Sequence, residues 1–114
     1  MDASPAVGGE NRGSRPMELL LMGLGGCSSI DVTMMLNKSR QEVSDCKAII
    51  EAERADAIPA VFTSIHVHFI VTGKGLSEKH VARAVQLSAE KYCSASIMLA
   101  KAVEITHDYE IIEI

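Results

Sequence analysis

The 114-residue sequence predicts a single α+β domain, because helical and strand-like segments follow one another without the regular β-α alternation of a doubly wound fold. The expected order is a long helix, a β-hairpin, two shorter helices and a closing strand. The long helix is apolar nearly all round, and a chain with so few other elements cannot cover such a helix alone. We therefore expect a homodimer in which a second subunit covers it.

The composition is that of a globular domain, with 47% hydrophobic and 23% charged residues. The net charge of −4, without a Lys/Arg cluster, argues against binding to nucleic acid or to a membrane surface. Residues 1–15 are rich in Gly, Ser, Pro and charge, which predicts a flexible N-terminal segment ahead of a domain at 16–114. No secretory signal is visible, and three widely spaced cysteines make no disulfide framework, so we expect reduced thiols in the cytoplasm.

The first helix is expected to run from Pro16 to about Ser39, since proline at a first helical position loses no hydrogen bond. Its central part, Leu19–Leu36, is apolar enough to resemble a membrane span. It contains three glycines and an aspartate, which is costly in lipid, so we interpret it as a helix buried in protein with Leu20 in the core. The glycines each cost roughly 1 kcal/mol relative to alanine and suggest close approach of another backbone.

The remaining elements are predicted from hydrophobic periodicity and turn residues. They are strands at Lys47–Arg54 and Phe62–Thr72, helices from Ser77 to Tyr92 and at Ala95–Ala102, and a strand at Glu104–Ile114. The turn-forming sequence DAIP at 56–59 predicts that the first two strands form an antiparallel hairpin.

Two cysteines are the strongest candidates for chemistry. Cys27 lies within the apolar helix, and Cys93 lies 66 residues later, just before a short helix whose N–H groups could face its thiol. The alternative is that both are small core residues, as free cysteines often are. Cys46 follows Asp45, whose carboxylate tends to raise a thiol pKa, so we interpret it as structural.

No metal or cofactor site is predicted, because the sequence has no Cys-x-x-Cys and no closely spaced Cys/His pair. His66 and His68 could reach a metal together, but such residues are more typically on the solvent side of a half-buried strand. The same interpretation applies to His107, and His80 is expected to be exposed. Asp31 shares a helical face with Cys27 and would disfavour the thiolate unless a cation intervened.

Three segments resemble the OsmC/Ohr family of thiol peroxidases, and especially its short, uncharacterised branch: PMELLLMGLGGCSSIDV, LSAEKYCSASIML and ITHDYEI. The resemblance covers residues 14–114. It implies an intertwined homodimer, with two central helices packed between antiparallel sheets. It also implies reduction of organic hydroperoxides or hydrogen peroxide in oxidative-stress defence. Cys27 would then be the peroxidatic cysteine and Cys93 the resolving one, with no bound cofactor but an external dithiol, such as a lipoyl group or dithiothreitol, as reductant.

The resemblance further implies a thiolate-stabilising Arg from the family's N-terminal strand region and a Glu directly after the helix-starting Pro. That second position is Met17 here, and the Glu stands one residue later, at Glu18, about 100° further round the helix. Glu18 and Arg15 are therefore the candidate supporting residues, with Arg12 as an alternative to Arg15. The competing hypothesis is a non-enzymatic dimer of the same fold that binds a small ligand or senses redox state.

Overall fold

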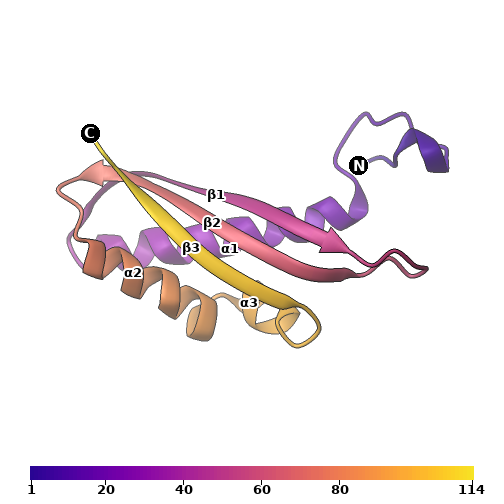
Figure 1. Cartoon of the computed structure of the whole chain (residues 1–114). Coiled ribbons are helices and arrows are strands. Elements are labelled where there is room, and N and C mark those ends of the chain that lie inside the picture. The colour runs from indigo at the N-terminus through magenta and orange to yellow at the C-terminus, as the bar shows by residue number, and fades with distance from the viewer.

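The computed structural model describes residues 1–114 as a three-stranded sheet with helices packed against one of its faces (Figure 1). In chain order the elements are a short 3-10 turn (Pro5–Val7), α1 (Pro16–Lys38), β1 (Glu42–Arg54), β2 (Phe62–Lys74), α2 (Glu78–Leu87), the π-helical turn η2 (Ser88–Tyr92), α3 (Ser94–Leu99) and β3 (Glu104–Glu113). This confirms the α+β class and the predicted order of elements. That residues 1–15 are flexible stays a prediction.

The sheet has the order β1-β2-β3. β1 and β2 form the predicted antiparallel hairpin, with Ile50 opposite Val67. β3 runs parallel to β2, with His107 opposite Val67, so the expectation of a purely antiparallel sheet is wrong. The reason is the connection: α2 and α3 carry the chain back along the sheet before β3 begins, and such a helical crossover delivers a parallel neighbour.

The core lies between the sheet and the helices. Alternate residues of β2 point into it, and α1 and α2 cover them, in keeping with the alternation that predicted the strand. The core residues are Leu24, Val32 and Leu36 of α1, Phe62, Ile65, Val67, Phe69 and Val71 of β2, Val81, Ala84 and Val85 of α2, and Cys93. At Gly25 a Cβ would lie 2.8 Å from Cδ1 of Ile50, so this glycine permits the close approach of α1 to β1.

One side of α1 remains uncovered by the rest of the chain. We call it the α1 stripe; it comprises Leu19, Met22, Gly23, Gly26, Ile30 and Met34, all of them exposed. A Cβ at Gly23 or Gly26 would meet nothing within 4 Å. The stripe agrees with the inference that α1 needs a cover from outside the chain.

Leu20 is 47% exposed within one chain, so it does not belong to the chain's own core, and Leu24 occupies that position one turn later. A helix that is apolar all round carries no sequence signal for the side that faces the sheet. By length and composition α1 could also cross a membrane, since its most apolar window has a mean hydropathy of 1.6. In this fold, its inner side packs on the sheet.

Candidate active site

Cys27, Cys93 and Asp31 meet beneath the sheet. The two cysteine sulfurs and one carboxylate oxygen of Asp31 all lie within 4.8 Å of one another. Cys27 and Asp31 stand one turn apart on α1 and therefore share a face. Cys93 comes from the junction of η2 and α3. The fold thus brings together two thiols that lie far apart in the sequence.

The position of Cys93 is set by the ends of two short helices. Its extended backbone separates η2 from α3, and its N–H donates to the carbonyl of Ser88 at 2.8 Å. Its Sγ accepts a hydrogen bond from the N–H of Ser96 at 3.4 Å, which caps α3. Its Sγ also lies 3.2 Å from Oγ of Ser28 on α1. These contacts hold the buried sulfur against the helix that carries Cys27.

The environments of the two thiols differ. Cys93 is fully buried, and burial raises its pKa above the ordinary thiol value. The hydrogen bonds from Ser28 and Ser96 oppose this increase, whereas the neighbouring Cys27 adds to it. Cys27 is only partly buried. Cys93 is therefore held as a neutral thiol at neutral pH, beside a more accessible partner.

Asp31 places a carboxylate beside the sulfurs. Its Oδ2 is buried and has no hydrogen-bond partner in the chain. Leaving a buried polar group unpaired typically costs about 1–3 kcal/mol, and more when the group is charged.

Glu18 and Arg15 lie at the start of α1. Oε1 of Glu18 accepts the backbone N–H of Arg15 at 2.7 Å, and the Arg15 guanidinium donates to Oδ1 of Asn11 at 3.3 Å. Cys27 comes nine positions after Glu18 on α1, a distance of about 13.5 Å along the helix axis. Within one chain the structure therefore does not bring Glu18 or Arg15 to the thiols. Arg12 instead pairs with Glu10 at 2.6 Å on the surface.

A cavity of about 420 Å³ adjoins the site, with Asp31 in its wall. Met34, Met35 and Leu87 give it apolar sides, and Lys38 and Arg83 supply positive charge. Sequence reasoning missed these two cations. Arg83 and Leu87 do lie one turn apart on α2, but nothing in that spacing shows that this side of α2 faces the end of α1.

Cys46 lies on β1, apart from the pair. Its pKa is raised, chiefly by burial and to a smaller extent by Asp45. The predicted direction is confirmed, but burial contributes more than the neighbouring carboxylate.

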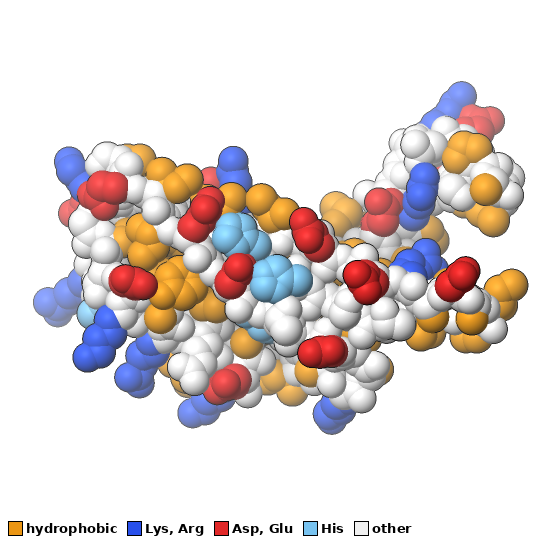
Figure 2. All heavy atoms as spheres, viewed as in Figure 1, with side chains coloured by type: hydrophobic (Ala, Val, Ile, Leu, Met, Phe, Trp, Pro, Cys, Tyr) orange, Lys and Arg blue, Asp and Glu red, His pale blue; other side chains and the backbone are white.

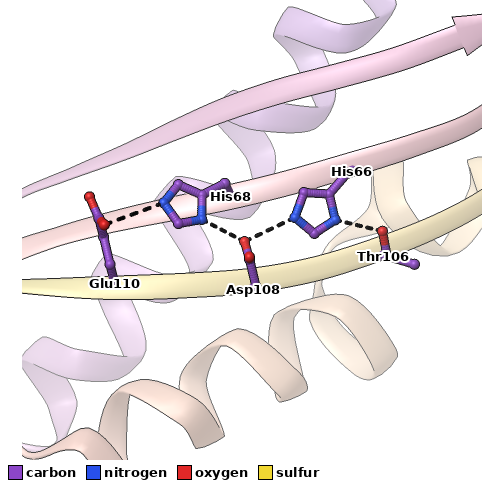
Figure 3. A network of polar contacts seen from close by, with 5 residues as sticks. All are labelled: His66, His68, Thr106, Asp108 and Glu110. Atoms are coloured by element: carbon purple, nitrogen blue, oxygen red, sulfur yellow. Dashed lines mark hydrogen bonds and ion pairs between the residues drawn. The ribbon is translucent and has the colours of Figure 1, made fainter.

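The outer face of the sheet carries a polar network of its own, between β2 and β3 (Figure 3). Asp108 Oδ1 contacts His68 Nδ1 at 2.5 Å and His66 Nε2 at 3.0 Å. His66 Nδ1 lies 2.6 Å from Oγ1 of Thr106, and Glu110 approaches Nε2 of His68 at 3.8 Å. The side chains of His66 and His68 are 39% and 29% exposed, and Figure 2 shows histidine side chains at the surface among acidic ones. His66 and His68 therefore lie on the solvent side, as predicted.

His107 lies on the opposite face, so its predicted solvent-side position is wrong. Its ring stacks on Phe69, with centroids 6.3 Å apart and planes 8° from parallel. Burial lowers its pKa. The period of two in β3 puts His107 on the side opposite Asp108, and the sequence alone did not show which set faces the helices.

Replacing Asp108 by asparagine is expected to lower the pKa of His68. The hydrogen bond to Asp108 is the main cause that raises the pKa of His68, and His68 is the main cause that lowers the pKa of Asp108. NMR titration of the imidazole signals measures the change, with exposed His80 as internal control. An unchanged His68 titration would contradict this network.

The two shifts act on stability in opposite pH ranges. The His68 contribution is complete below the unfolded histidine pKa and is lost as pH rises through the raised folded pKa. The Asp108 contribution is complete above the unfolded aspartate pKa and is lost as pH falls through the lowered folded pKa. The pair should therefore stabilise the fold most between these limits, at mildly acidic pH.

The fold and the site define a small α+β protein in which a long apolar helix presents one thiol to a second. A family model described as OsmC-like protein matches residues 9–108. The chain is 57% identical over 97 residues to Protein YhfA of Escherichia coli K12, covering 85% of this chain and 72% of that protein. The chain therefore belongs to the OsmC-like family, which confirms the resemblance found in the sequence.

Solved structures agree with this assignment. A hypothetical protein from Aquifex aeolicus VF5 superposes with a TM-score of 0.79 at 35% identity, covering 90% of this chain and 79% of that one. An organic hydroperoxide resistance protein OsmC from Legionella pneumophila has a TM-score of 0.72 at 16% identity, covering 100% and 80%. At that identity, the second likeness shows the fold alone.

Proposed function

We propose that this protein is a two-cysteine thiol peroxidase that reduces organic hydroperoxides or hydrogen peroxide. The observation that supports this most is the meeting of Cys27 and Cys93 within 4.8 Å. The Cys27 thiolate attacks the O–O bond and becomes a sulfenic acid, and the departing alkoxide or hydroxide takes up a proton from solvent to leave as an alcohol or water. The Cys93 thiol condenses with it, giving a disulfide and water. An external dithiol, such as a lipoyl group, then reduces the disulfide.

The assignment of roles follows from accessibility. Cys27 is partly exposed and so can meet a peroxide, whereas Cys93 is buried and its raised pKa keeps it protonated until the sulfenic acid forms. The apolar walls of the adjoining cavity suit an apolar peroxide. The fold is also that of the Legionella protein named for organic hydroperoxide resistance.

A homodimer through the α1 stripe would complete the site. The point halfway between Glu18 and Cys27 on α1 lies next to Gly23, where no other part of the chain comes close. Two α1 helices packed antiparallel there would bring Glu18 and Arg15 of one subunit toward Cys27 of the other. In this proposal the protein is a cytoplasmic homodimer without nucleic-acid or membrane partners.

The decisive experiment is peroxide consumption with dithiothreitol or dihydrolipoamide as reductant. Cumene hydroperoxide and hydrogen peroxide should both be tested, on wild type, Cys27→Ser and Cys93→Ser. We expect Cys27→Ser to abolish turnover and Cys93→Ser to inactivate during cycling, because its sulfenic acid goes untrapped. Cys46→Ser, which removes the third thiol, should keep wild-type activity. A folded wild-type protein with no turnover would refute the proposal.

Replacing Ile30 by aspartate is expected to convert the dimer to monomer, because it puts a charge on the α1 stripe. Ile30 is 61% exposed in the chain, so the core of one subunit is untouched. Light scattering after size-exclusion chromatography measures the mass. The matched control is Ile49→Asp, which changes an isoleucine that is 49% exposed on the outer face of β1 and should stay dimeric. A dimeric Ile30→Asp variant would place the interface elsewhere.

Asp31 favours a second candidate, a redox sensor on the same fold. Its carboxylate lies within 4.8 Å of both sulfurs, and a negative charge there would repel the negative peroxide oxygen that forms as a sulfur attacks, which would slow the reaction. A sensor would form its disulfide slowly and once, without turnover at catalytic rates. The rate constant for oxidation of the reduced protein, measured by stopped flow, separates the two.

A further inference from the structure

The donor atoms of Cys27, Cys93 and Asp31 suit a metal ion as well as a peroxide. We propose that the reduced site binds one Zn²⁺ through these three residues. Zinc takes Cys sulfur at about 2.3 Å and carboxylate oxygen at about 2.0–2.2 Å, so donors on one tetrahedral ion lie roughly 3.6–3.8 Å apart. All three donor atoms already lie within 4.8 Å of one another. Side-chain movements of about 1 Å would bring the donor atoms from 4.8 Å to the separation that a tetrahedral ion requires.

Asp31 gives an independent reason to expect a cation. Its Oδ2 is buried and lacks any hydrogen-bond partner in the chain. Two thiolates and a carboxylate in contact would repel one another, and a divalent ion among them removes most of that charge. A Zn²⁺ ion bound through Oδ2 of Asp31 would thus give this buried oxygen the partner that it lacks within the chain.

The surroundings of Cys93 suit a metal ligand. The N–H of Ser96 and the hydroxyl of Ser28 contact its sulfur at 3.4 and 3.2 Å. Outer-shell donors of this kind orient a ligand and stabilise its charged form. Two sulfurs and one oxygen select a thiophilic ion over Mg²⁺ or Ca²⁺, which prefer oxygen ligands.

Only three protein ligands are present, so the fourth coordination position is open, as in zinc sites that bind water or an exogenous ligand. Asp31 also lines the adjoining cavity, which is the side from which such a ligand would arrive.

Zinc and peroxide would compete for the same sulfurs, and this consequence rests on the proposed function. The two zinc-bound thiolates, one hydroperoxide and two protons give the disulfide, one alcohol and one water, and the Zn²⁺ is released because its sulfur ligands are gone. Zinc would thus hold the thiols reduced and inactive until it is removed by a chelator or by oxidation.

The test uses the full chain, reduced and metal-free, in the absence of peroxide. Zn²⁺ affinity is measured by competition with a chromophoric chelator, and Co²⁺ serves as a spectroscopic probe. We expect one ion per chain, with sulfur-to-cobalt charge-transfer absorption and the d–d bands of a tetrahedral site. Cys27→Ser, Cys93→Ser and Asp31→Asn should each weaken Zn²⁺ binding by at least about tenfold, as loss of even an outer-shell partner does. Asp31→Asn should keep the sulfur-to-cobalt band.

Two control variants exclude other ligands. Cys46→Ser removes the remaining thiol, and His68→Ala disrupts the outer-face histidine network; neither should change the affinity. Absence of Zn²⁺ binding, or an affinity unaltered by Cys27→Ser or by Asp31→Asn in variants with wild-type circular dichroism, would overturn the site. Peroxidase activity is measured separately with a chelator present. Zn²⁺ binding without peroxide turnover would support the zinc site and refute the proposed function. Peroxide turnover without Zn²⁺ binding would support the proposed function and refute the zinc site.

Discussion

Replacing Phe69 by alanine is expected to lower the free energy of unfolding by about 3–5 kcal/mol. Phe69 is fully buried in the middle of β2, and its ring stacks on His107. Truncation leaves a cavity between the sheet and the helices. The neighbouring inward side chains of β2 are β-branched, with restricted rotamers, and cannot move to fill it. Domains are typically stable by only about 5–15 kcal/mol, so the variant should be close to unfolding. Urea denaturation followed by circular dichroism measures the loss.

The matched control for Phe69 is its neighbour Ile70, which points to the outer face of the same strand. Ile70→Ala should cost about 1 kcal/mol or less, because that side chain is only partly buried. Equal losses for the two variants would mean that β2 does not present Phe69 to the core.

Replacing Leu24 by alanine should cost about 2–5 kcal/mol, the range for a buried leucine. Leu24 is fully buried on the inner side of α1, where Gly25 lets the helix sit against Ile50. Thermal and urea unfolding measure the loss, with Ile49→Ala on the outer face of β1 as control. A variant within about 1 kcal/mol of wild type would contradict the orientation of α1.

Leu20→Ala extends this comparison to the partner subunit. Leu20 is nearly half exposed in the chain, so the contacts within one subunit predict only a small loss in the free energy of unfolding. A larger loss in the free energy of unfolding would indicate that a partner subunit buries Leu20 on the outer side of α1.

Local signals predicted most of the elements. Pro16 and the return of polar residues at Asn37 bounded α1, and the DAIP turn identified the hairpin. β1 begins at Glu42, five residues earlier than predicted, because a register irregularity between Val43 and Asp45 interrupts the alternation that marks a strand. The parallel pairing of β3 has no local signal, since its period of two is the same in either direction.

The candidate site was predictable only in part. Cys27 and Cys93 stood out through their positions in helices and through the family motifs, and Asp31 through its helical spacing from Cys27. Lys38 and Arg83 could not be found in the same way, because their approach to the cavity depends on how α1 and α2 pack. A ligand set drawn from positions 27, 31 and 93 likewise matches no short metal-binding motif, since only the tertiary fold closes the distance.

The sequence separation of Cys27 and Cys93 has a thermodynamic consequence for the oxidised protein. A disulfide between them would enclose more than half of the chain, including the whole hairpin and α2, in one covalent loop. Closing a loop of this size reduces the conformational entropy of the unfolded chain by the equivalent of about 4 kcal/mol in the chain-entropy model. For a domain of this length, each kcal/mol moves the melting temperature by roughly 4–8 °C. The disulfide form should therefore have a much higher melting temperature than the dithiol form, and the melting temperature should report the oxidation state of the two cysteines.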